Sequence, residues 1–177
     1  MLITIHCLSQ KRWPWLTLVA VALCLEGVAL YLQHVLRVEP CNECIYVRAG
    51  VLALGAAGLV GALAPRYWIV RLVALTGCLT ALGWSLYRVN LLLGLEQIVR
   101  DGGEASCKRF KGFPDWMALD RWLPEVFEPR AMCGTVNWTL LGHSVTFWIG
   151  VALLGITFVI GTGLLAQTLN VKVVRYK

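Results

Sequence analysis

The chain has 177 residues, of which 58% are hydrophobic and 15% are charged, and its mean hydropathy is +0.69. So much apolar surface excludes an ordinary water-soluble domain of this length and favours a helical membrane protein. The formal net charge of +6 does not indicate nucleic-acid binding, because purely basic segments alternate with acid-containing ones between hydrophobic stretches, which is a pattern of membrane topology.

Four hydrophobic stretches predict membrane-spanning helices at 15–36, 45–64, 69–95 and 145–169, because a span needs about 20 apolar residues. The first follows Lys11 and Arg12 as a secretory signal would, but it is longer than a signal core and no small-residue cleavage site follows it. We therefore expect it to be retained. Glu26, deep in this span, is expected to pair with a polar group between helices; a part in proton uptake is the alternative. The expected fold is a single all-α membrane domain over 1–177, a bundle of four helices.

The first connection, 37–44, ends in the motif Cys41-Asn-Glu-Cys44. Pro40 precedes the motif and a helix is expected to begin there, which places Cys44 in the first turn. Free amides and the positive end of the helix dipole stabilise a thiolate at this position. Arg48 follows four residues later on the same face and adds positive charge.

The second span is rich in small residues, which allow membrane helices to approach closely and predict a tight bundle. They include Gly50, Gly55, Gly58 and Gly61. Arg48 and Arg88 each lie just inside the outer end of a span. A functional role is the default for an intramembrane charge, and snorkelling to the headgroups is the alternative, most of all for Arg88.

The long connection, 96–144, contains Cys107 and Cys133 and a stretch with apolar residues at helical spacing. This stretch predicts a short amphipathic helix that lies on the membrane surface; a loop helix packed against the bundle is the alternative. The residues concerned are Trp116, Leu119, Trp122, Leu123, Val126 and Phe127.

The distribution of charge predicts that both termini are cytoplasmic, because their segments and the turn after the second span are basic and contain no acid. Loops 37–44 and 96–144 then face the opposite, oxidising compartment, together with Cys41, Cys44, Cys107 and Cys133. Cys7, Cys24 and Cys78 are expected to be reduced or buried thiols.

The cysteine spacing disfavours two common kinds of site. Cys107 and Cys133 are 26 residues apart, which does not supply the second close ligand pair of a zinc site, and Ile45 stands where haem attachment requires histidine. Two readings remain open: a thiol relay to a lipid-soluble electron carrier, and a purely structural disulfide.

The motifs together resemble the DsbB family of membrane thiol oxidoreductases, which reoxidise the periplasmic disulfide donor DsbA and reduce quinone. The resemblance covers almost the whole chain. It is carried by Trp13-Pro-Trp15, Glu26, Gln33-His34, the run Pro40-Cys-Asn-Glu-Cys-Ile-Tyr-Val-Arg48, Phe113-Pro-Asp-Trp116, Leu119-Asp-Arg-Trp-Leu-Pro124 and Cys133.

The resemblance implies a protein of the bacterial inner membrane with a DsbA-like periplasmic partner and with ubiquinone or menaquinone as cofactor. It implies redox pairs Cys41–Cys44 and Cys107–Cys133, with DsbA attacking Cys107, Cys133 engaging Cys41, Cys44 released beside the quinone, and Arg48 holding the quinone.

The chain also departs from the family pattern. Asn42 and Glu43 stand inside the motif where members often have apolar residues, Val47 replaces an acid, and near Glu96 there is no histidine of the kind that helps some relatives bind quinone. A quinol-linked reductase working in the opposite direction and an inert scaffold stapled by disulfides remain alternatives.

Overall fold

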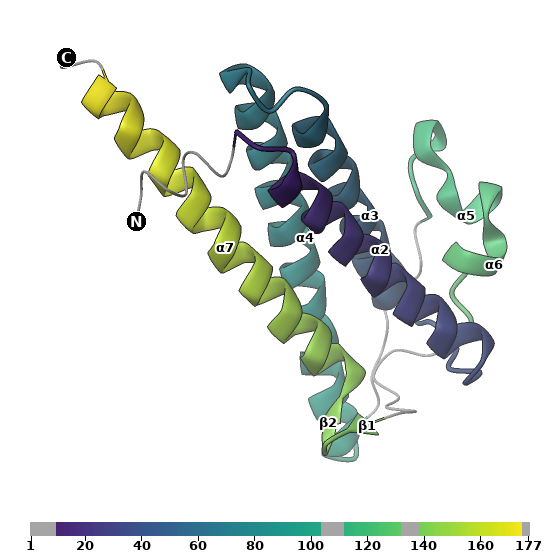
Figure 1. The fold of residues 1–177 in the computed structure, drawn as a ribbon. Coiled ribbons are helices and arrows are strands. Elements are labelled where there is room, and N and C mark those ends of the chain that lie inside the picture. Colours follow the sequence, from purple (N-terminus) through teal and green to yellow (C-terminus); the bar gives the residue numbers. More distant parts are fainter. Residues whose placement is uncertain (1–9, 104–111, 132–138, 175–177) are drawn as a thin grey trace.

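Four long helices dominate the computed structural model, which describes residues 10–103, 112–131 and 139–174 (Figure 1). They are α2 (Trp13–His34), α3 (Asn42–Leu63), α4 (Trp68–Arg100) and α7 (Val145–Val174). All four are long and apolar enough to cross a membrane, α7 over Val145–Leu165. The all-α fold with four spans that the sequence predicted is therefore confirmed, and the chain is a multi-pass membrane protein.

The helix boundaries follow from proline and glycine. α3 ends at Leu63, one residue before Ala64, whose backbone leaves the helical region because Pro65 follows it. α4 continues five residues beyond the predicted end at 95 and ends at Arg100. Gly102, two residues later, has a φ of 81° and donates its amide to the Val99 carbonyl. Its 33 residues rise about 50 Å, which exceeds the hydrocarbon thickness of about 30 Å.

Within the bundle, α3 packs against both α2 and α4, and α7 packs against α4. Leu54, Cys78, Leu82 and Leu153 are fully buried at these contacts, so Cys78 is a buried thiol as predicted. The glycines of α3 account for the close approach. A methyl group at Gly61 would collide with the indole of Trp15 on α2.

The expected loop helix is present as three short pieces: the 3-10 turn η1 (Asp115–Met117), α5 (Leu119–Trp122) and α6 (Pro124–Phe127). Pro124 has no amide to donate, so the helix breaks at Leu123 and starts again. Phe127 is buried and its ring lies 5.9 Å from that of Phe113, while Trp122 and Leu123 are exposed. One side of the segment is thus packed inward, and its place on a membrane surface stays a prediction.

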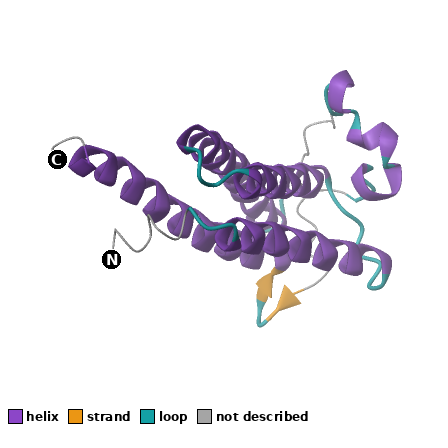
Figure 2. Ribbon diagram, turned by 45° about the horizontal axis from the view of Figure 1, so that its top comes forward, coloured by secondary structure: helices purple, strands orange, loops and turns teal. Residues whose placement is uncertain are grey.

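Two two-residue strands, β1 (Thr139–Leu140) and β2 (His143–Ser144), form an antiparallel hairpin directly before α7. Figure 2 shows this hairpin and the α5–α6 segment on different sides of the bundle. In Figure 1 the hairpin lies at the end of the bundle opposite the turn between α3 and α4, and α5 and α6 lie beside the bundle.

Replacing Gly61 by Ala should lower the free energy of unfolding by about 1–3 kcal/mol, because the added methyl overpacks the contact with the buried Trp15 ring. Gly83→Ala is the matched control, since nothing lies within 4 Å of the added methyl. Unfolding in mixed detergent, followed by circular dichroism, measures both. Equal stability of the two variants would contradict this account of α2–α3 packing.

Candidate active site

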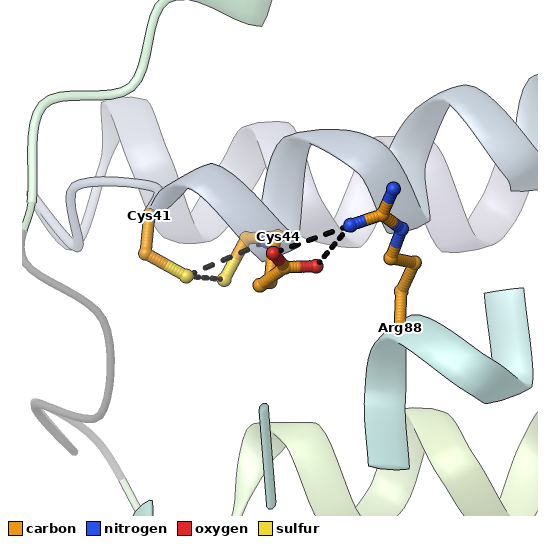
Figure 3. A network of polar contacts seen from close by, with 4 residues as sticks. Cys41, Cys44 and Arg88 are labelled. Carbon is orange, nitrogen blue, oxygen red and sulfur yellow. Dashed lines mark hydrogen bonds and ion pairs between the residues drawn. The ribbon is translucent and has the colours of Figure 1, made fainter. Parts of the chain in front are cut away.

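The first turn of α3 brings the motif cysteines together. Cys41 is the N-cap residue, with an extended backbone, and its Sγ accepts the amide of Cys44 at 3.4 Å. The two Sγ atoms lie 2.7 Å apart, and both residues are free thiols in this structure (Figure 3). Cys41 is buried and Cys44 is partly buried. The pair is thus placed to interconvert between dithiol and disulfide with little movement.

The helix start favours a thiolate on Cys41. A hydrogen bond from the Cys44 side chain lowers the pKa of Cys41, and the backbone amides of Cys44 and Glu43 lower it further. Burial and the Glu43 carboxylate oppose this shift. The sequence assigned the stabilising amides to Cys44, whereas the structure directs them to the cap residue, because a cap accepts the amides of the turn that follows it.

A cavity of about 180 Å³ opens beside the two thiols, between α2, α3, α4 and the start of α7. Its walls are mainly aliphatic. Polar groups enter it from Glu26, Arg48, Glu96, Ser144 and Thr146, as well as from Cys41 and Cys44. Thr146 donates a hydrogen bond to Glu96, which joins α7 to α4 at the cavity wall. The sequence left this part of the site unassigned because no histidine stands near Glu96, and the 50 positions between Glu96 and Thr146 gave no sign that the two residues meet.

Arg48 lies in this cavity wall and also binds the long connection. It is buried, and its Nη1 donates to Gln33 Oε1 at 2.6 Å and to the Val126 carbonyl at 2.9 Å. Gln33 in turn donates through Nε2 to the Glu125 carbonyl at 2.6 Å. Arg48 therefore does not reach out to the headgroups. It connects the cavity with α2 and α6.

The long connection also pairs with the motif through its backbone. The amides of Arg130 and Ala131 donate to the Pro40 carbonyl at 3.0 and 3.2 Å, and Ala131 forms a parallel bridge with Cys41. Cys107 and Cys133, the other two predicted redox residues, lie outside the described residues. Cys133 follows Ala131 by two positions.

The sequence did not predict the partner of Arg88. Its Nη1 forms an ion pair with Glu43, the acid inside the motif, at 3.1 Å (Figure 3). The two residues are 45 positions apart on different helices, so no spacing rule connects them. Glu26 is a buried acid at the cavity, and its pairing with a polar group between helices stays a prediction.

Comparison with known proteins covers most of the chain. The family model described as "Disulfide bond formation protein DsbB" matches residues 11–163. "Disulfide bond formation protein B" of Shewanella denitrificans is 41% identical over 148 residues, which is 83% of each chain. "Disulfide bond formation protein B 2" of Pseudomonas aeruginosa is 44% identical over 139 residues, 78% of this chain and 82% of that one.

Replacing Cys44 by Ala should raise the pKa of Cys41, because it removes the hydrogen bond that lowers this pKa most. Below its pKa a thiol is alkylated about tenfold more slowly for each unit by which the pKa rises. The pH dependence of iodoacetamide labelling at Cys41, read by mass mapping, measures the shift. Cys24→Ala, an exposed residue of α2, is the control. An unchanged Cys41 profile in Cys44→Ala would contradict the assignment.

Proposed function

Since this chain belongs to the DsbB family, whose members are membrane oxidoreductases that reoxidise DsbA, we propose that it works by passing two electrons from Cys107–Cys133 to Cys41–Cys44 and on to a quinone. The chain is a protein-disulfide oxidoreductase, and membership of the family disfavours both the inert scaffold and the reductase working in reverse. The single observation that carries the residue assignment is the Cys41–Cys44 pair beside a cavity that contains Arg48.

The first exchange takes place on the long connection. One thiolate of a reduced DsbA-like partner attacks Cys107 of the Cys107–Cys133 disulfide, which forms a mixed disulfide and releases Cys133 as a thiolate. The second partner thiol then displaces Cys107, so the partner leaves oxidised and the two electrons stay on the chain. The reduced partner supplies both electrons and both thiol protons.

The second exchange needs Cys133 to reach Cys41. The backbone bridge at Ala131 supports this step, because two residues of chain span at most about 7 Å. Cys133 attacks Cys41 of the Cys41–Cys44 disulfide, and Cys44 leaves as a thiolate at the cavity wall. Arg48, four residues deeper on the same helix face, stabilises negative charge there. Cys107 then attacks Cys133, which re-forms the Cys107–Cys133 disulfide and frees Cys41, so both electrons are on the Cys41–Cys44 pair.

The cavity residues fit a quinone head group. An apolar cavity of roughly 150 Å³ holds a benzene ring, and this one is similar in volume, is walled by aliphatic side chains and contains a guanidinium. A bound quinone would accept the two electrons and two protons and leave as quinol. Arg48 would hold it by a charge-assisted hydrogen bond to a carbonyl oxygen, and Cys44 is the sulfur nearest in sequence to that arginine.

The orientation follows from the charges. We place the turn at Pro65–Tyr67, which contains Arg66, in the cytoplasm, and the motif with residues 96–144 on the periplasmic side of the inner membrane. The structure is compatible with this, since the start of α3 and the turn after it lie at opposite ends of the bundle.

Purified protein mixed with a reduced DsbA-like protein and a soluble quinone should consume quinone in proportion to the partner thiols oxidised. Cys44→Ser should abolish this. Cys133→Ser leaves Cys107 as a lone thiol, which attacks the disulfide of the oxidised partner, so this variant mixed with oxidised partner should accumulate a Cys107-linked adduct because Cys133 is not there to displace the partner. Quinone absorbance and non-reducing gels measure the two results. Wild-type quinone loss no faster than that of Cys44→Ser would reject the proposal.

Arg48→Met should raise the KM for quinone about ten- to a hundredfold, since a hydrogen bond to a charged group contributes about 1.5–3 kcal/mol. Exchange between the partner and Cys107, measured without quinone, is the internal control and should stay within twofold of wild type. If Arg48→Met slows that exchange and leaves the quinone KM unchanged, Arg48 serves only to hold the loop.

A further inference from the structure

Glu43 stands between the two motif cysteines in the sequence, and its carboxylate pairs with Arg88. Nη1 of Arg88 lies 3.1 Å from one carboxylate oxygen and 3.3 Å from the other. Only 19% of the Arg88 side chain and 11% of the Glu43 side chain are exposed, so water screens the pair weakly. Figure 3 shows Arg88 reaching from α4 towards the turn that contains Cys44.

Two aromatic rings fix the Arg88 guanidinium in this position. Its central carbon lies 4.4 Å from the ring centre of Tyr46 on α3 and 4.4 Å from that of Trp84 on α4. Both distances are those of a cation–π contact. The buried Nε of Arg88 has no hydrogen-bond partner among the described residues, so the ion pair and the stacking hold the group. Arg88 is thus a preoriented cation directed at the motif.

The charge on Glu43 bears directly on the redox chemistry of the pair. Reducing the disulfide takes two electrons and two protons, and a proton then leaves the more acidic thiol, Cys41. The Glu43 carboxylate repels the thiolate and raises the pKa of Cys41. An uncompensated carboxylate would therefore disfavour the reduced form and make the disulfide a weaker oxidant.

We propose that Arg88 is a positioning residue that neutralises Glu43 and thereby keeps the Cys41–Cys44 couple oxidising enough to accept electrons. The inference rests on the proposed function, in which this pair is a redox couple. Arg88 would then help to set the reduction potential of the Cys41–Cys44 couple, whereas the alternative from the sequence was that it snorkels to the headgroups. Several other charged groups lie around the thiols and stay constant in the comparison below: Glu26, Glu39, Arg48 and Glu96.

The experiment isolates the couple by replacing Cys107 and Cys133 with Ser. The protein in detergent is equilibrated with defined ratios of reduced and oxidised glutathione. In this equilibrium the Cys41–Cys44 disulfide and two molecules of reduced glutathione convert to the dithiol and one molecule of oxidised glutathione. Trapped thiols are then counted by mass mapping. Arg88→Met should shift the equilibrium constant about tenfold towards the disulfide, which equals about 30 mV for two electrons.

Three further variants test whether the effect runs through Glu43. Glu43→Gln should shift the equilibrium in the opposite direction, towards dithiol. The double variant Arg88→Met with Glu43→Gln should lie closer to wild type than Arg88→Met does, because neither charge is then left alone. Arg88→Lys should restore most of the wild-type value. Arg121→Met is the matched control, since Arg121 and its partner Asp115 are exposed.

The measurement needs neither the partner protein nor quinone, so the role of Arg88 can fail independently of the proposed function. Equilibrium constants within twofold of wild type for Arg88→Met and Glu43→Gln would overturn the inference and leave the proposed function intact. The inference would also fail if Arg88→Met and Glu43→Gln shifted the equilibrium constant in the same direction. A chain in which no Cys41–Cys44 disulfide forms under any glutathione ratio would overturn both.

Discussion

Everything at this site depends on how a helix begins. The first four amides of an α-helix lack partners within the helix, and α3 directs two of them, those of Glu43 and Cys44, to the Cys41 sulfur. With Cys41 at the cap and Cys44 three positions later, the motif has the spacing at which a cap side chain and a first-turn side chain meet in many soluble helices. The cap geometry that gives these amides a hydrogen-bond acceptor also sets the distance between the two sulfurs. Any change that moved the start of α3 by one residue would disturb both.

Arg48 and Arg88, the two arginines near the thiols, have definite partners. Arg48 is bound by an amide side chain and a loop carbonyl, and Arg88 by a carboxylate and two rings. Such pairing is required where water is scarce, because an isolated buried charge costs several kcal/mol. It also means that each arginine links two segments of the chain. The cavity beside the thiols is therefore built by contacts that hold the helices and the connection in one arrangement.

The spans were predictable because a run of about twenty apolar residues has few alternatives to a membrane helix. The start of α3 was predictable because Pro40 and the cysteine motif mark it. Other features depend on distant partners. Nothing local indicates that Glu43 meets Arg88, that Thr146 donates to Glu96, or that Arg48 binds Val126. The apolar spacing in the loop correctly predicted helix. It predicted one continuous helix, however, because the spacing was given more weight than Pro124, which divides the segment into pieces. Cys107 and Cys133 stay predictions from sequence, since they lie outside the described residues.

The pairing between Pro40 and the residues before Cys133 is made by main-chain atoms alone. Its strength is accordingly indifferent to which side chains stand at Arg130 and Ala131, so evolution is free to vary their charge and size. Proline is the exception, since it removes the donor itself. A proline at either position would remove one of the two hydrogen bonds to Pro40 and weaken the link to the cysteine motif, while leaving every cysteine in place.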